Sequence, residues 1–305
     1  MYKVDGMAEM YHVLSKEILE KGDIVSPRGM ETRELITPVI HIENPKSRLA
    51  FLPERKFNIV YALVESLMLI SKTKKLDYFT EFNPKMASFS DDGMLLHGAY
   101  GERIAREIEV VISKLKSDKD SRQAVLSIYN NDLIYNTKDV PCTMNLHFLI
   151  RENKLNLIVY MRSNDIIWGT PYDIFMFTML QEVIANTLGI DVGYYRHVPS
   201  SLHVYAQHYE MLEKMADCTE VIMNDNNFDL YGFKTLARDY KELVDLNKYE
   251  DDGKLYSNNF VQYRNVILNE KSYRDDVWAS RNNVFITSNV PEWTKKFTTR
   301  WINDK

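Results

Sequence analysis

Hydrophobic and polar residues alternate on both sides of a short polar segment, and this pattern predicts an antiparallel hairpin over residues 142–163. A period of two is typical of strands with one buried face. The apolar positions are Met144, Leu146, Phe148 and Ile150, then Leu155, Leu157, Val159 and Met161. A turn at Glu152 and Asn153 pairs Ile150 with Leu155 at one end of this set and Met144 with Met161 at the other. The same register places Cys142 opposite Ser163.

The open end of this hairpin gathers groups that could hold a small polar substrate. Cys142 supplies a thiol, and Arg162 and Ser163 are residue types that bind anions. Strict alternation, however, turns Arg162 to the face opposite Ser163. If both side chains serve one site, the strand should bulge there.

Longer stretches follow the helical period. One stripe ends near Gly22, and a further helix begins at Pro171 and ends at Gly189. Residues 57–71 are apolar around most of the circumference, as in a buried helix. The remaining predictions are a helix over 103–116, strands over 35–42, 124–129 and 201–205, and loops over 26–33 and 83–101.

Two carboxylates lie in predicted helices where their charge needs a reason. Burying an ionised Glu65 costs several kcal/mol unless it is paired or hydrogen-bonded, or its pKa rises. The alternative places Glu65 at the helix rim, facing solvent. Asp173 falls in the first turn of its helix, where a negative charge is favourable by ~0.3–1 kcal/mol. Each of the two carboxylates can therefore have either a structural role or a chemical one.

Composition limits the class of protein. The chain has 305 residues, 45% of them hydrophobic, which allows a sizeable core. A formal net charge of -5 gives no general basic surface, so no nucleic acid polymer is expected as partner. A local arginine cluster could still hold one phosphate. We expect a cytoplasmic protein with no membrane partner, because no segment is typical of a signal peptide or membrane span.

The two cysteines, Cys142 and Cys218, are expected to be free thiols. No metal is expected either, since no spacing typical of metal ligands occurs. Cys142 is the candidate nucleophile, with a thiolate favoured by an arginine such as Arg162 or Arg28. The alternative is an inert buried cysteine. Neither the Cys-His-Asn order of thiol proteases nor a glycine-rich phosphate loop is evident.

Four ordered motifs give the chain a resemblance to a known family. They are Pro141-Cys142, Arg162-Ser163-Asn164-Asp165, Gly169-Thr170-Pro171-Tyr172-Asp173 and Ser201-Leu202-His203-Val204-Tyr205. At these spacings they resemble the successive signatures of the thymidylate synthase and deoxycytidylate hydroxymethylase family. The similarity covers roughly residues 15–210. Glu65, Tyr100-Gly101 and Asp120-Ser121-Arg122 fall where the family also has functional residues.

The resemblance implies a fold and an assembly. The family fold is α/β (α+β), a large twisted mixed β-sheet with packed helices, and two such sheets pack face to face in a homodimer. We therefore expect a catalytic domain over residues 1–217. Residues 218–305 are expected to extend the same domain, in a role that the sequence leaves open.

The resemblance also implies how a pyrimidine nucleoside monophosphate is bound. Cys142 would add to C6 of the base, so that C5 attacks the methylene carbon of 5,10-methylenetetrahydrofolate, the co-substrate. His203 and Tyr205 would bind the sugar 3′-hydroxyl. The residues implied for the 5′-phosphate are Arg28, Arg162 and Ser163, with Arg122 from the partner subunit.

Four further residues are implied around the base and the folate. Asp165 would meet the pterin ring, with Gly169 beside it. Glu65 would organise water and proton transfer and also border the folate. Tyr100 would assist removal of the C5 proton.

Some positions depart from the thymidylate synthase pattern. That pattern has a histidine where this chain has Thr143, a second arginine where it has Gln123, and tryptophans in the loop before Tyr100, where residues 83–96 have none. The closing carboxy-terminal tail is not recognisable in residues 301–305. Thymidylate synthases also have an asparagine where this chain has Asp173.

Asp173 is the position expected to select the base. Uracil presents an N3-H donor and an O4 acceptor, which suits an amide. Cytosine presents an N3 acceptor and an N4 amino donor, which suits a protonated carboxyl, or a carboxylate facing N3-protonated cytosine. The sequence thus favours a cytidylate hydroxymethylase. The alternatives are a C5-methylating enzyme (thymidylate synthase or a cytidylate methylase) and a non-catalytic nucleotide-binding member of the family.

Overall fold

The structure is a computed structural model. It describes residues 1–48, 50–51, 57, 61–62, 65–66, 68–69, 73–80, 83–130, 137–218 and 222–223. Most of the helix predicted over 57–71 lies outside the described residues, as do the tail at 301–305 and nearly all of the extension predicted over 218–305.

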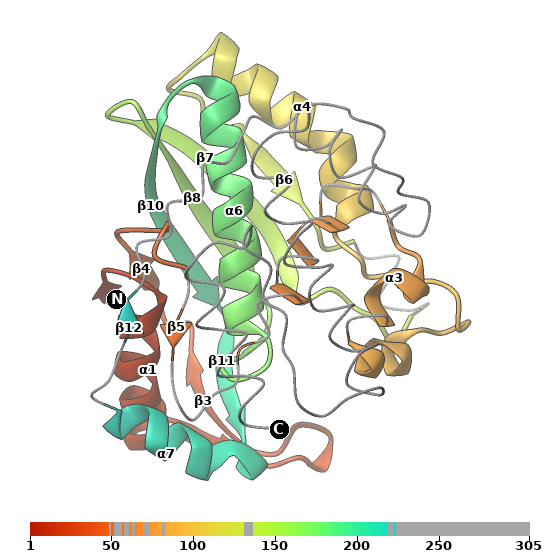
Figure 1. The fold of residues 1–305 in the computed structure, drawn as a ribbon, viewed down its shortest axis with the longest axis vertical. Helices are drawn as coiled ribbons and strands as arrows, with labels where there is room; N and C mark the ends of the chain where they lie inside the picture. The colour runs from red at the N-terminus through yellow and green to blue at the C-terminus, as the bar shows by residue number, and fades with distance from the viewer. Residues whose placement is uncertain are drawn as a thin grey trace, which may run out of the picture.

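A mixed sheet runs through the molecule (Figure 1). Its strands lie in the order β1-β4-β10-β8-β7-β6. Strand β8 is antiparallel to β7 and parallel to β10, which confirms the mixed sheet that the family resemblance implied. The strands are β1 (Tyr2–Val4), β4 (Ile40–Ile42), β6 (Val125–Ser127), β7 (Thr143–Arg151), β8 (Lys154–Met161) and β10 (Asp191–Pro199).

A second sheet continues from the first. The chain leaves β8 at Met161, crosses two residues and enters β9; it leaves β10 at Pro199 and enters β11 after Ser200. The second sheet has the order β2-β3-β11-β9 and the strands β2 (Asp23–Val25), β3 (Thr32–Ile36), β9 (Asn164–Asp165) and β11 (Ser201–Tyr205). A short pair joins β5 (Ala50–Phe51) to β12 (Ile222–Met223). The junction of the two larger sheets falls at Arg162 and Ser163.

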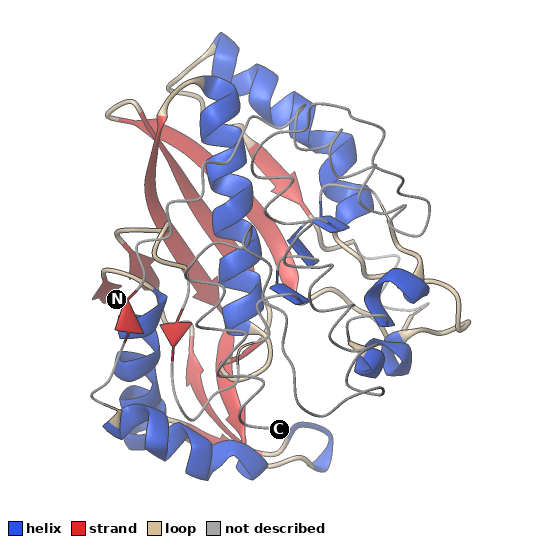
Figure 2. Cartoon of the chain, viewed as in Figure 1, coloured by secondary structure: helices blue, strands red, loops and turns tan. Residues whose placement is uncertain are grey.

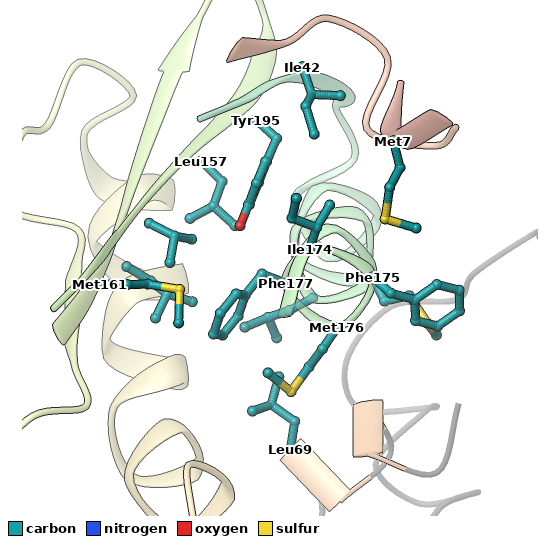
Figure 3. Close-up of a cluster of buried hydrophobic side chains, with 14 of the residues drawn as sticks. Met7, Ile42, Leu69, Leu157, Met161, Ile174, Phe175, Met176, Phe177 and Tyr195 are labelled. Carbon is teal, nitrogen blue, oxygen red and sulfur yellow. The ribbon is translucent and has the colours of Figure 1, made fainter. Parts of the chain in front are cut away.

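Helices α4 and α6 lie across one face of the larger sheet (Figure 2). Helix α6 is apolar around most of its circumference and is buried from Ile174 through Ala185, as its sequence requires. Figure 3 shows Ile174 and Phe177 of α6 facing Leu157 and Tyr195 of the sheet. The helices are α1 (Met7–Lys21), α3 (Leu76–Thr80), α4 (Gly101–Ser117), α6 (Thr170–Leu188) and α7 (Tyr209–Asp217), with 3-10 turns at Pro27–Gly29, Pro84–Phe89 and Ala206–His208.

The opposite face of this sheet is partly exposed to solvent in the single chain. Val125 of β6 is paired with His147, and the side chain of Val125 is 40% exposed. Tyr160 of β8, paired with Asn145, is 38% exposed. Parallel strands usually have both faces of their sheet covered. A partly apolar face with a parallel pair at its centre is therefore suited to contact with another surface.

The hairpin has the predicted turn but not the whole predicted register. Glu152 and Asn153 both have positive φ, 53° and 55°, as a two-residue type I′ turn requires. The predicted pairs hold from Ile150 with Leu155 to Leu146 with Val159. Beyond them the register shifts between Thr143 and Asn145. The expected partners of Met161 and Cys142 were therefore wrong: Thr143 pairs with Met161, and Arg162 N donates to Cys142 O at 2.8 Å.

Two strand predictions also need correction. The strand expected over 35–42 is two strands in different sheets, because Thr37 has a φ of 51° and Pro38 cannot donate to a ladder. Strand β10, at the centre of the larger sheet, was not predicted. Its alternation is broken by a register shift between Val192 and Tyr195. Gly193 lies in this shift, where a Cβ would meet Asn156 Oδ1 at 2.0 Å.

Candidate active site

The junction between the two sheets collects side chains from distant parts of the chain. Cys142 immediately precedes β7, Arg162 and Ser163 link β8 to β9, and Asp173 lies in the first turn of α6. Tyr100 immediately precedes α4, and Glu65 comes from a helical segment. Asp173 interacts electrostatically with Glu65, Tyr100 and Cys142. Arg28 and Arg162 act on Cys142 in turn. The structure thus brings the predicted nucleophile, base-reading carboxyl and two arginines into one neighbourhood.

Cys142 is partly buried, and burial raises the pKa of its thiol. Arg162 and Arg28 lower the pKa, as expected, whereas Asp173 and Asp139 raise it. The net direction is upward, because desolvation is the largest of these effects. The prediction named arginines that do act on the thiol. Their effect, however, only reduces the cost of forming a thiolate in the free protein.

Arg162 fixes the segment that carries the thiol. Its Nε donates to Pro141 O and its Nη2 donates to Val140 O, both at 2.9 Å. The side chain is exposed, and Nη1 makes no hydrogen bond to the described residues. Arg162 can therefore hold the loop before Cys142 and still present N–H groups to an anion. A strand break, rather than a bulge, separates Arg162 and Ser163 from the strict alternation of β8.

Tyr100 contacts the start of strand β7. Thr143 N donates to the Tyr100 hydroxyl oxygen at 3.3 Å, and the ring stacks on Phe177 with centroids 6.1 Å apart. Burial raises the pKa of Tyr100 well above its ordinary value, with Asp173 and Cys142 adding to the shift. Tyr100 is therefore a neutral hydroxyl at physiological pH. It can donate or relay a proton near the thiol.

Glu65 and Asp173 are two carboxyls of the site whose pKa values are both raised. Burial, and then the charge of Asp173, raise the pKa of Glu65 to about 8, while Tyr61 donates to Glu65 Oε1 at 3.3 Å. Burial raises the pKa of Asp173 to about 7, and a hydrogen bond from Asn164 opposes that shift. Asp173 keeps partial solvent exposure, but protein atoms surround it closely enough for desolvation to dominate. Both carboxyls can hold protons near neutral pH, which suits proton transfer.

Strands β9 and β11 carry the residues predicted for the folate and the sugar. Asp165 is paired with His203, whose ring meets that of Tyr205 at 5.3 Å. Asp165 Oδ1 accepts from Ile167 N and Trp168 N, whereas Oδ2 is buried without a partner among the described residues. His203 Nδ1 is likewise buried without a hydrogen-bond partner among the described residues. A buried free acceptor on Asp165 fits the N–H donors of a pterin ring.

Three other predicted residues have more limited support. Arg28 has a φ of 54° in an exposed turn, and its charge reaches Cys142. Ser163 is partly buried between β8 and β9. Gly169 packs tightly, because a Cβ there would lie 2.9 Å from Asn164 Nδ2. Phosphate binding by Arg28 and Ser163 and folate binding by Gly169 stay predictions.

Arg122 is not gathered with the others. Its side chain is exposed, and its carbonyl oxygen lies 3.2 Å from His147 Nε2. His147 is five positions along the chain from Cys142, which corresponds to roughly 15 Å of strand. Arg122 therefore lies well along β7 from the thiol of its own chain.

A buried polar network behind Asp173 was not predicted. Asn164 and Thr170 both lie within the quoted motifs but were given no role. They are hydrogen-bonded to each other, and Asn164 also bonds to Asp173. Asn164 connects through His197 to Tyr195, two side chains of β10. The two β10 residues alternate on one face, but their strand was not recognised. The described residues hold no cluster of three or more His, Cys, Asp or Glu placed for a metal, and no described helix is long and apolar enough to cross a membrane.

Comparison with known proteins assigns the family. The sequence model described as thymidylate synthase matches residues 9–255. The chain belongs to the thymidylate synthase family. This result confirms the resemblance on which the predicted roles depend. It also makes the protein a transferase of one-carbon groups, in a family that acts on pyrimidine nucleoside monophosphates with 5,10-methylenetetrahydrofolate as co-substrate.

Several relatives are named as hydroxymethyltransferases. The chain is 33% identical to a deoxyuridylate hydroxymethyltransferase of Bacillus phage SP01, over 81% of this chain and 69% of that protein. It is 34% identical to a deoxyuridylate hydroxymethyltransferase of Pseudomonas phage M6, over 59% of this chain and 53% of the relative, so it spans about half of that protein. A thymidylate synthase of Bacillus mojavensis is 25% identical over 74% of this chain and 90% of the relative.

Proposed function

We propose that this protein transfers a hydroxymethyl group to C5 of a pyrimidine nucleoside monophosphate. The observation that carries the proposal is the position of Cys142, beside Arg162 and within the electrostatic reach of Asp173. One site can then offer a nucleophile for C6, a cation for the 5′-phosphate and a carboxyl for the base. Similarity to proteins named hydroxymethyltransferases supports hydroxymethylation over methylation.

The proposed roles follow from the state of each side chain. Cys142 adds to C6 as a thiolate, and Asp173 hydrogen-bonds the polar edge of the base. Glu65 and Tyr100, both protonated near neutral pH, hold and pass protons around the base and its water. The free oxygen of Asp165 accepts a hydrogen bond from the folate. When bound, 5,10-methylenetetrahydrofolate supplies the one-carbon unit.

Cytosine is our first candidate for the base, because the chain has Asp173 where thymidylate synthases have asparagine. A protonated carboxyl donates to N3 and accepts from the N4 amino group. Uracil is the second candidate, since the phage relatives are named for deoxyuridylate. A protonated carboxyl can also complement uracil, by donating to O4 and accepting from N3-H. The choice between cytosine and uracil therefore depends on which oxygen of Asp173 carries the proton and on where that oxygen lies along the edge of the base.

One experiment separates hydroxymethylation from methylation. The protein is incubated with 5,10-methylenetetrahydrofolate and either dCMP, CMP or dUMP, and products are identified by mass. We expect a gain of one CH2O unit without formation of dihydrofolate, because water completes the reaction. A gain of CH2 with dihydrofolate absorbance would show a methylating enzyme instead. Nucleotide binding with no product would support a non-catalytic role.

Arg162→Ala should weaken nucleotide binding by more than ~2 kcal/mol if the bound phosphate desolvates the contact, because a charge-assisted hydrogen bond is lost. Loss of the hydrogen bonds to Val140 and Pro141 should also loosen the segment that carries Cys142. Arg151→Ala is the matched control, because it removes the same charge from the exposed far end of the hairpin. Calorimetry measures the dissociation constants. Equal values for wild type and Arg162→Ala would remove Arg162 from the phosphate site.

We further propose a homodimer in which the partly exposed sheet face is the contact and Arg122 reaches the phosphate site of the partner subunit. Support comes from the exposed Val125 and Tyr160 and from the distance of Arg122 along β7 from its own Cys142. Mixing Arg122→Ala with Cys142→Ala subunits should restore activity, because a hybrid dimer has one site without either lesion. Subunit exchange is verified by mass. Exchange without recovered activity would contradict a shared site.

A further inference from the structure

A chain of buried hydrogen bonds runs from strand β10 to the carboxyl of Asp173. Tyr195 and His197 share a bond of 2.8 Å between the hydroxyl oxygen and Nδ1, and His197 Nε2 lies 2.8 Å from Asn164 Oδ1. The Thr170 hydroxyl shares its single proton between the same Asn164 oxygen, at 2.6 Å, and the carbonyl oxygen of Asp165, at 2.9 Å. Asn164 Nδ2 then donates to Asp173 Oδ2 at 2.8 Å. Figure 3 shows the ring of Tyr195 between the sheet and α6, within the hydrophobic core.

The donors and acceptors in this chain have one consistent direction. Asn164 Oδ1 is an acceptor, so His197 must carry its proton on Nε2 and accept from Tyr195 at Nδ1. Burial lowers the pKa of His197 to about 3, so the ring remains neutral with a single N–H. The N–H of His197, together with the hydroxyl proton that Thr170 shares between Oδ1 and Asp165 O, holds the Asn164 amide in one orientation. Its NH2 group is thereby directed at Asp173.

This direction matters because a neutral carboxyl has two arrangements. The proton can be on Oδ1 or Oδ2, and moving it exchanges the donor and acceptor that the base meets. Cytosine and uracil need opposite arrangements along the same edge. An N–H that donates to Oδ2 makes that oxygen the acceptor and favours the proton on Oδ1. Gly169 leaves room for this contact, since a Cβ there would approach Asn164 Nδ2 and Asp173 Oδ2 at 2.9 and 3.4 Å.

We propose that Asn164 is a specificity-determining positioning residue, and that Tyr195, His197 and Thr170 fix its amide so that Asp173 carries its proton on Oδ1 and meets only one of the two bases correctly. The inference deepens the proposed function and rests on it. It does not depend on which base is preferred. Glu65, Tyr100 and Cys142 also interact electrostatically with Asp173, but among the described residues none of the three is hydrogen-bonded to its carboxyl.

The test compares binding of dCMP and dUMP, without folate, to wild type and three variants. Asn164→Ala removes the donor to Asp173. Tyr195→Phe removes only the hydroxyl that fixes the His197 tautomer and leaves the ring in the core. Thr178→Val is the control, because it removes a buried hydroxyl of α6 that donates only to carbonyls of its own helix, Ile174 O and Phe175 O. Deoxyribose 5-phosphate, which lacks a base, reports the phosphate contacts separately.

We expect the ratio of the two dissociation constants to fall at least about tenfold in Asn164→Ala and about threefold in Tyr195→Phe, because the wrong arrangement of Asp173 is no longer excluded. Binding of deoxyribose 5-phosphate should stay within about twofold in all variants. A pH series adds an independent readout. Asn164 stabilises the ionised carboxylate, so its loss raises the pKa of Asp173 further, and the pH at which nucleotide affinity changes should move upward. Loss of packing alone would not produce that shift.

Each outcome decides the inference. If the folded Asn164→Ala and Tyr195→Phe proteins keep the wild-type base preference, the inference is wrong while the proposed function stands. A wild type that binds both nucleotides equally also overturns it. If Asn164→Ala does not fold, Tyr195→Phe decides alone. A wild type that binds neither nucleotide overturns the proposed function as well.

Discussion

Cys142→Ala should abolish turnover and leave the nucleotide dissociation constant within about tenfold of wild type. The variant lacks the nucleophile for C6, so the covalent path is closed, whereas the phosphate and base contacts remain. The effect on turnover is expected to be the largest of any single substitution. Product formation is measured by mass, and binding by calorimetry in the absence of folate.

Cys218→Ala provides the matched control for this experiment. Both cysteines are partly buried thiols, but Cys218 follows α7 and has no role in the proposed site. The control should keep wild-type turnover. Near-normal turnover in Cys142→Ala would refute the covalent mechanism, whatever base the protein prefers.

Asp173→Asn should shift the base preference toward uracil. If Asp173 reads cytosine, the wild type should favour the cytidine monophosphate by at least ~30-fold in catalytic efficiency, because the wrong base leaves polar groups unpaired at ~1–3 kcal/mol each. An amide donates to O4 and accepts from N3-H, so the variant should favour uridylate. Its turnover of cytidylate should fall, because the amide cannot pass a proton to N3. The measurement is catalytic efficiency for both nucleotides with both proteins.

The alternatives to this account give different ratios. If Asp173 were only a charge at the helix N-terminus, the substitution would cost a few tenths of a kcal/mol in stability and leave base preference unchanged. A wild type that already favours deoxyuridylate, as the names of the phage relatives suggest, would show that the neutral carboxyl is arranged for uracil. Cytosine would then be excluded as the preferred base.

The pKa of Asp173 gives this prediction a pH dependence. Burial raises the pKa to about 7, so the proton available for the base is present below that pH and is lost as pH rises through it. Cytidylate affinity of the wild type should therefore fall through neutral pH. Stability has the same sign, because the folded protein favours the protonated carboxyl: the free energy of unfolding decreases as pH rises from the ordinary value of about 4 toward 7. Asp173→Asn should remove this titrating group from the pH dependence of both cytidylate affinity and stability.

The sequence by itself determined the elements whose signals are local. The hairpin follows from a period of two and a polar turn, and Glu152 and Asn153 adopt the expected turn conformation. Helix α6 follows from Pro171, an apolar stripe and Gly189, all within one segment. The motifs around Cys142, Arg162 and Asp173 identified the family before any geometry was known, because they contain the reactive groups in consecutive residues.

The tertiary structure alone decided how these groups act on one another. The raised pKa of Cys142 depends on the balance between burial and charges from residues as distant in sequence as Arg28 and Asp173. The direction of the Asp173 carboxyl depends on Asn164, which is fixed by Tyr195 and His197 on a strand that sequence pattern did not reveal. Desolvation and hydrogen-bond direction are properties of the space around a group. That space is formed here by segments that only the folded sheets bring together.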